Sequence, residues 1–171
     1  MKMVREMIIQ QKTKIARDTF EMLLRNEEIA DQAKPGQFLH ILIPGCTLRR
    51  PISIADVDRM QGTITILFKV SGEGTAQLAY FTEGMHLNVL GPQGKGFPLQ
   101  IKENGSILLI GGGIGVPPIY FLAKNLASQN CNIHAVLGFQ KKEYAFMRTN
   151  LRRFVKRMSL QMMALWVRKD L

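Results

Sequence analysis

Two short segments of the chain carry residue types that bind phosphate groups. The first is RRPIS, residues 49–53, where a guanidinium offers a planar fork of donors beside a rigid proline turn and a serine hydroxyl. The second is GGGIGVPP, residues 111–118, directly after the apolar run ILLI. Its glycines let the backbone approach a dinucleotide, and the helix start that follows directs free N–H groups toward phosphate. The pair predicts a flavin site and a nicotinamide nucleotide site.

Neither segment by itself is specific for a nucleotide-binding site. RRPIS also fits a basic turn that leads into a strand, and GGGIGVPP departs from the GxGxxG pattern, with no acidic ribose partner where that fingerprint would place one. A third segment, LFKVSGEGT at residues 67–75, ends a strand in small residues. Gly72 and Gly74 would let amides approach an anion, and Thr75 could cap the next helix. A glycine hairpin is the alternative for this segment.

Other candidates are weaker. GPQGKGF, residues 91–97, lacks the GKS or GKT ending of a phosphate loop. Asp56 and Asp58 fit a solvated turn better than a carboxylate pair. The three histidines and two cysteines show no metal-ligand spacing, so we expect no metal site and no disulfide framework.

Size and composition indicate an ordinary globular protein. The 171 residues suffice for one core or two small ones, and 46% are hydrophobic against 21% charged. No run approaches the roughly 20 apolar residues of a membrane span, and the N-terminus lacks the features of a secretory signal. We therefore expect a cytoplasmic protein that is not inserted in a membrane.

The net charge of +10 is concentrated at the C-terminal end. Residues 147–171 hold seven Lys or Arg and one acid, a net of +6, which leaves +4 for the first 146 residues. A uniformly basic protein would suggest nucleic acid or anionic membrane as a partner. Because the basicity belongs mostly to one end, we expect neither partner.

The pattern of elements changes partway along the chain. Six apolar or β-branched runs separated by turn residues predict an antiparallel barrel or sandwich over residues 1–100, with a short helix after Gly74. Residues 101–146 then read as strand, glycine turn, amphipathic helix and strand, which is one βαβ unit. The boundary is expected near residues 97–105. The fold class is thus an antiparallel barrel or sandwich followed by an incomplete α/β domain with an exposed sheet edge.

Taken together, RRPISIAD, LFKVSGEGT, VLGPQGKGFPL and GGGIGVPP resemble, in order and spacing, the electron-transfer subunits of type B dihydroorotate dehydrogenase, within the ferredoxin reductase-like flavoproteins. The resemblance covers residues 1 to about 146. It implies an FAD-binding antiparallel barrel, an NAD-binding α/β domain, and a C-terminal [2Fe-2S] cluster held by four cysteines. It also implies a catalytic FMN-containing dihydroorotate dehydrogenase subunit as partner, in a heterotetramer that passes electrons to NAD in pyrimidine biosynthesis.

The resemblance assigns binding roles, and no catalytic residue, to positions of this chain. The flavin itself would perform the redox chemistry while the protein positions it. Arg50 would hold the diphosphate. The implied FAD-binding residues are Arg50, Pro51, Ile52, Ser53, Leu67, Phe68, Lys69, Gly74 and Thr75, and those for the nicotinamide nucleotide are Gly111, Gly112, Gly113, Gly115 and Pro117.

Past Phe146 the resemblance stops. Residues 147–171 read at face value as a basic, methionine-rich helix with RRFVKR at its centre, and the cluster cysteines are absent. Reading each codon one base earlier forces Asp, Gly and Gly at three places and permits [DN]DGxxGxx[GR]x, close to the DDGSxGxKGF turn of the family. The same shift turns residues 146–150 into a possible Tyr-Glu-Asp-Glu-Phe. We therefore predict that residues 147–171 are translated out of frame and that electron transfer is impaired.

Two other functions remain open at this point. A flavoprotein subunit of a sulfide dehydrogenase or NADPH-ferredoxin transhydrogenase would share the same pair of domains. A non-enzymatic protein whose basic tail binds nucleic acid or lipid is the alternative of another class. In every case we do not expect the chain alone to be a complete enzyme.

Overall fold

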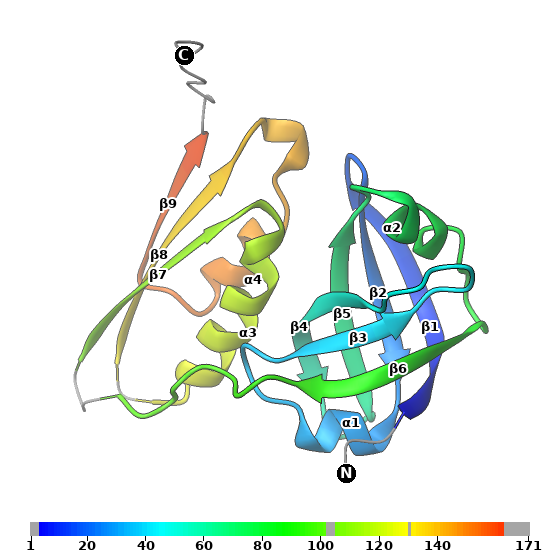
Figure 1. Ribbon diagram of the computed structural model, residues 1–171. Coiled ribbons are helices and arrows are strands. Elements are labelled where there is room, and N and C mark those ends of the chain that lie inside the picture. The colour runs from blue at the N-terminus through cyan, green and yellow to red at the C-terminus, as the bar shows by residue number, and fades with distance from the viewer. Residues whose placement is uncertain (1–3, 102–104, 130, 163–171) are drawn as a thin grey trace, which may run out of the picture.

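The computed structural model describes residues 4–101, 105–129 and 131–162. They form an antiparallel β-barrel and, beside it, a parallel β-sheet with helices on one face (Figure 1). The predicted fold class, a barrel followed by an α/β unit, is confirmed. Within the described residues, no helix is long and apolar enough to cross a membrane.

The barrel is closed in the strand order β1-β2-β5-β4-β3-β6, with β6 pairing back onto β1. Each of the six runs expected from alternation forms one strand, because side chains at every second position enter the interior. Met7 and Ile9 of β1 and Leu87 and Val89 of β6 are among the buried ones. The strands are β1 (Val4–Ala16), β2 (Thr19–Arg25), β3 (Phe38–Leu42), β4 (Arg50–Asp58), β5 (Thr63–Lys69) and β6 (His86–Gln93).

Two short helices lie at opposite ends of the barrel (Figure 1). Helix α2 (Glu73–Leu78) follows β5, where a helix was expected. Helix α1 (Glu27–Gln32) was not expected, because six residues carry too little periodicity to be seen in the sequence. The Asn26 side chain caps it by accepting from the Ile29 amide, and Ile29 and Ala30 are buried in the barrel core.

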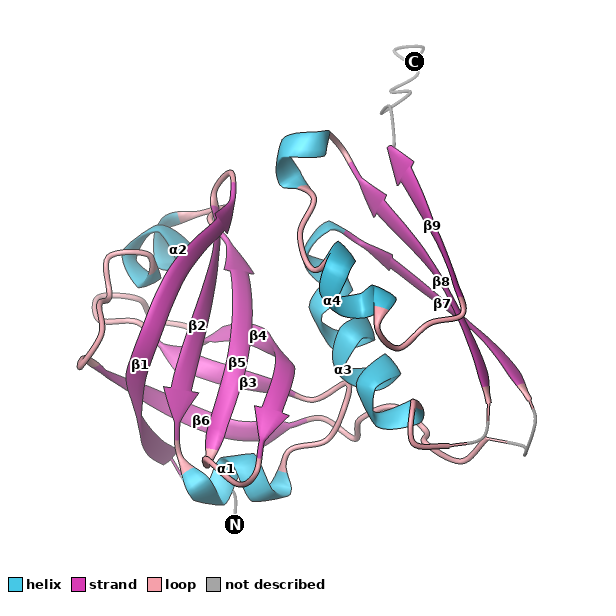
Figure 2. Cartoon of the chain, turned by 180° about the vertical axis from the view of Figure 1, so that it is seen from behind, coloured by secondary structure: helices cyan, strands magenta, loops and turns pink. Residues whose placement is uncertain are grey.

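The second part has three parallel strands in the order β7-β8-β9. Strand β7 (Ser106–Gly112) leads through the turn η1 (Gly113–Gly115) into α3 (Val116–Leu126), and then come β8 (Asn132–Phe139) and η2 (Lys142–Tyr144). Helices α3 and α4 lie on the face of the sheet that is turned toward the barrel (Figure 2). On the opposite face Leu108 and Ile110 are 60% and 67% exposed, although parallel sheets are usually covered on both faces.

The region after Phe146 differs from the expected single helix. Helix α4 (Arg148–Arg152) is only five residues long, and β9 (Arg157–Met162) pairs in parallel with β8. The chain turns between them because Phe154 and Val155 pack against the apolar cluster around α3, with the Phe154 ring 5.7 Å from that of Tyr120. RRFVKR is therefore mostly outside the helix, and residues 163–171 lie outside the described residues.

The barrel and the second part are in direct contact. Ala55 of β4 and Leu67 of β5 are buried in the apolar cluster of the second part rather than in the barrel core. Lys124 of α3 donates to both carboxylate oxygens of Asp56 at 2.7 and 2.8 Å. Asp56 thus joins the two parts and does not lie in the solvated turn expected from the sequence. These contacts fix the outer face of β4 and β5 against α3.

Candidate functional site

A cavity of about 340 Å³ opens where β4 begins and β5 ends. The two strands are antiparallel neighbours, so the start of one lies beside the end of the other. Because β4 begins at Arg50, the RPIS segment is the first part of a strand rather than a turn. The lining residues are Arg50, Pro51, Ile52, Ser53, Leu67, Phe68, Lys69, Ser71, Thr75 and Ile114. Eight of the nine residues predicted for FAD are in this set, which brings two distant sequence segments together.

The two adjacent arginines have different environments. Arg49 donates to the carbonyls of His40 and Asn88 at 3.2 Å each and to Asn88 Oδ1 at 2.6 Å, so it joins β3 to β6. Arg50 lines the cavity and is partly buried, and its guanidinium forms no hydrogen bond or ion pair with any residue that the structure describes. A guanidinium in this position has all its donors available for an anionic ligand.

Gly74, the ninth predicted residue, lies next to the Arg50 side chain. A Cβ atom on Gly74 would be 2.2 Å from Arg50 Nε, so only glycine leaves room for the arginine in its present position. The N-cap of α2 is Gly72, and Thr75 contributes to the cap from position N3. Its hydroxyl accepts from the Ser71 and Gly72 amides at 2.9 and 3.3 Å, which orders the loop beside the cavity.

The end of β5 presents its residues alternately to the two sides. Phe68 points into the barrel core, where its ring lies 5.7 Å from that of Phe20. Leu67 points outward and is buried between the two parts. Both side chains are almost wholly buried. We infer that what these two positions can offer a ligand is largely their backbone, whereas Lys69 also contributes its side chain.

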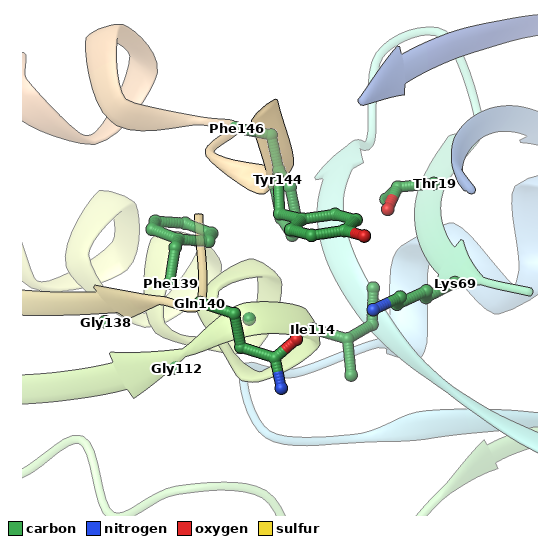
Figure 3. A pocket seen from close by; sticks show the side chains of 10 residues that line it. Thr19, Lys69, Gly112, Ile114, Gly138, Phe139, Gln140, Tyr144 and Phe146 are labelled. Atoms are coloured by element: carbon green, nitrogen blue, oxygen red, sulfur yellow. The ribbon is translucent and has the colours of Figure 1, made fainter. Parts of the chain in front are cut away.

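A second cavity, of about 310 Å³, lies between the barrel and the parallel sheet. Figure 3 shows Thr19 and Lys69 on the barrel side, Gly112, Gly138 and Gln140 on the sheet side, and the Tyr144 ring above them. The cavity opens at the carboxyl ends of β7 and β8, where Gly112 is paired with Gly138. In open α/β sheets this edge is where nucleotides bind.

Lys69 and Ile114 line both cavities, so the two adjoin. Lys69 Nζ lies 4.6 Å from the centroid of the Tyr144 ring, a cation–π contact. The segment that carries Tyr144 is also held by Arg17, which donates to Glu143 at 3.2 Å. This hydrogen bond is the main cause of the raised pKa of Arg17. The barrel and the sheet thus jointly position the side chains at the junction of the cavities.

The glycine segment is only partly in the second cavity. Gly112 and Gly113 line it, and Gly113 has a φ of +49°, a conformation that favours glycine. Gly111, Gly115 and Pro117 do not line it. A Cβ on Gly111 would be 3.2 Å from Ile119, so that glycine allows close packing of α3 on β7. Gly115 is the N-cap of α3, and Pro117 is buried in its first turn.

Several lining residues were not predicted from the sequence. They come from the β1–β2 hairpin, from the loop before α2, from η1, from the last two residues of β8, and from the segment after β8. Gly138 and Phe139 belong to the predicted VLGF strand end, and Gln140 directly follows it, which was the one available signal. The others depend on tertiary contacts. These residues are Thr19, Ser71, Ile114, Gly138, Phe139, Gln140, Tyr144 and Phe146.

Comparison with known proteins places this arrangement in a family, although no family model matches the chain. The dihydroorotate dehydrogenase B (NAD(+)) electron transfer subunit of Shouchella clausii (strain KSM-K16) is 41% identical over 142 residues, covering 81% of this chain and 55% of the relative. That of Bacillus caldolyticus is 44% identical over 136 residues, covering 77% and 53%. The chain therefore spans about half the length of these curated relatives.

A solved structure shows the same arrangement of the backbone. An NADH-dependent reduced ferredoxin-NADP oxidoreductase, described for its flavin-based electron bifurcation, aligns with a TM-score of 0.81 and 32% identity over 90% of this chain and 55% of the other. The family likeness expected from the motifs agrees with these matches. The chain belongs to the family of the electron transfer subunits of dihydroorotate dehydrogenase B.

Proposed function

We propose that the chain is the flavin-binding part of a dihydroorotate dehydrogenase B electron transfer subunit. The first cavity takes FAD and the second takes the nicotinamide nucleotide. The single observation that carries this proposal is that the two cavities adjoin at Lys69 and Ile114. Electron transfer between two bound cofactors requires such closeness, and neither cavity alone would indicate it.

The residues around the first cavity fit FAD. Arg50 has its donors available for a diphosphate, and Gly74 leaves the space that the arginine occupies. Ser53 adds a hydroxyl, and Lys69 adds a positive charge at the junction of the cavities. When bound, FAD supplies the capacity to accept and pass on electrons. The protein groups bind, orient and shield it, and no acid, base or nucleophile from this chain is needed.

The residues do not fit a [2Fe-2S] cluster. Such a cluster is held by four cysteine thiolates, and the chain has two cysteines. Cys46 lies beside the barrel core, whereas Cys131 packs with the second part and donates weakly to the Leu126 carbonyl. We therefore assign no step of electron transfer in this chain to iron and sulfur.

The partner follows from the family. We propose a catalytic FMN-containing dihydroorotate dehydrogenase subunit as the electron donor and NAD or a related nucleotide as the acceptor. The 41–44% identity to dihydroorotate dehydrogenase B subunits favours this pathway over a sulfide dehydrogenase or transhydrogenase. The NADH-dependent reduced ferredoxin-NADP oxidoreductase is 32% identical.

We also keep the proposed division of the chain into residues 1–100, 101–146 and 147–171, the last translated out of frame. The match to relatives covers about 80% of the chain, which is compatible with a change near Phe146. Sequencing the gene across the Phe146 codon tests the idea. An extra or missing base there supports it, whereas close relatives with the same uninterrupted basic ending would refute it.

The absorbance spectrum of the purified chain tests the function. We expect the two visible bands of a bound flavin, without iron-sulfur features, in the protein as isolated or after incubation with FAD and removal of the excess. A folded protein that stays colourless after this treatment would contradict the proposal.

A further inference from the structure

The lining of the second cavity carries little charge. Among the described residues that form it, Lys69 has the one charged side chain, and the rest are glycines, Thr19, Gln140 and apolar or aromatic groups. A nicotinamide nucleotide brings a diphosphate into this space, and an ammonium group binds phosphate oxygens well. The direction of the Lys69 side chain therefore decides whether the lining meets the phosphates with a positive charge.

The Lys69 side chain has no carboxylate partner in the part of the chain that the structure describes, because none of the ion pairs there includes it. Its backbone is fixed in β5, where it is paired with Thr19 of β2. The four-carbon stem is flexible and by itself would let the ammonium turn to solvent. The ammonium instead contacts the face of the Tyr144 ring, with Nζ 4.6 Å from the centroid, beside the sheet (Figure 3).

The backbone that carries Tyr144 is anchored on both sides of that residue. Before it, the Glu143 carbonyl accepts from the Arg17 amide at 3.4 Å, and the Glu143 carboxylate accepts from the Arg17 guanidinium at 3.2 Å. After it, the buried Phe146 ring packs edge-on against Phe139, with 5.4 Å between the centroids. The ring is thus held between the β1–β2 hairpin and the end of β8, and it offers the flexible lysine a fixed surface.

We propose that Tyr144 is a positioning residue for the nicotinamide nucleotide. Its ring holds the Lys69 ammonium at the junction of the cavities, where the ammonium binds the phosphates of the nucleotide. The ring covers one side of the ammonium, and the other N–H donors stay available for phosphate oxygens. The family resemblance assigned Lys69 to FAD and gave Tyr144 no role. The inference rests on the proposed function, since it takes the second cavity as the nucleotide site.

Calorimetric titration of ADP-ribose into the full chain, at saturating FAD, tests this role without requiring hydride transfer. Tyr144→Leu keeps an apolar side chain but removes the ring. We expect it to weaken ADP-ribose binding about two- to five-fold, the effect of one cation–π contact, and Tyr144→Phe to bind like the unaltered chain. Arg17→Ala, which releases the segment that carries the ring, should weaken binding in the same direction. Tyr80→Leu removes an 81% exposed ring that lines neither cavity, so this matched control should change nothing.

A double-mutant cycle shows whether Tyr144 acts through the lysine. Lys69→Met should weaken ADP-ribose binding about ten-fold or more, because it removes a charge-assisted contact with phosphate. Adding Tyr144→Leu to Lys69→Met should then have no further effect. If the ring instead contacts the nucleotide directly, Tyr144→Leu weakens binding by the same factor in both backgrounds, and the inference is overturned.

Three other results would also overturn it: unchanged binding in both Tyr144→Leu and Arg17→Ala, a loss of affinity in Tyr144→Phe, or no binding of ADP-ribose to the unaltered chain. The flavin spectrum of the same samples separates these failures from failure of the function. A yellow unaltered chain that gives any of them refutes only the role of Tyr144. An unaltered chain that is folded but colourless contradicts the proposed function itself.

Discussion

Replacing Arg50 by Ala separates the binding role of this arginine from any structural role. In the protein without ligand the guanidinium has no partner among the described residues, so the free energy of unfolding should change by less than about 0.5 kcal/mol. In the complex the variant loses charge-assisted hydrogen bonds to the diphosphate, each worth about 1.5–3 kcal/mol. One such bond corresponds to a Kd for FAD raised about 10- to 150-fold.

The assay is fluorescence titration of FAD into the flavin-free protein, together with thermal unfolding of the same samples. Arg49→Ala is the matched control. It removes the three hydrogen bonds that Arg49 donates to β3 and β6, so it should lower the free energy of unfolding by about 1–3 kcal/mol. If Arg50→Ala lowers stability while the Kd for FAD stays unchanged, or if both variants weaken FAD binding equally at equal stability, the assignment of Arg50 to the diphosphate is refuted.

Three other predictions concern Gly74, the core residue Leu109 with Ile110 as its control, and Glu21. Gly74→Ala should displace Arg50 and weaken FAD binding with little change in melting temperature, because the added Cβ would be 2.2 Å from Arg50 Nε. Unchanged FAD affinity would contradict this role of Gly74. Leu109→Ala should cost about 2–5 kcal/mol in urea unfolding because Leu109 is 5% exposed, whereas Ile110→Ala, at 67% exposure, should cost less than about 0.5. Burial raises the pKa of Glu21 above its ordinary 4.5, so the folded state keeps the proton longer and stability falls as pH rises from 4.5 through the raised pKa. Glu21→Gln should remove this fall and be relatively more stable at pH 7; an unchanged pH profile of unfolding would refute it.

The strands of the barrel could be predicted well because the signal for each strand lies within its own short segment of sequence. Alternation along the strands decides which side chains enter a barrel, and the six runs show that alternation clearly. The α1 helix escaped prediction because its stability comes from burial of Ile29 and Ala30 rather than from its own six residues. The region after Phe146 escaped for a related reason, since the position of Phe154 depends on contacts with α3.

Some features of the binding residues could be predicted from the sequence, and others depend on contacts between distant segments. Arg50 to Ser53 and Leu67 to Lys69 were predicted from the family resemblance, and the structure brings them to one cavity. The different environments of Arg49 and Arg50 were not visible, because the partners of Arg49 come from strands far away in the sequence. Tyr144 likewise meets Lys69 only when the sheet packs against the barrel.

The central claim is that FAD binds at the start of β4 and the end of β5, next to the glycine turn. A crystal structure of the chain with bound FAD tests it most directly. The account predicts the diphosphate within hydrogen-bond distance of Arg50 and the flavin ring near Lys69 and Ile114. A diphosphate bound instead at residues 111–113, or FAD bound away from both cavities, would contradict it.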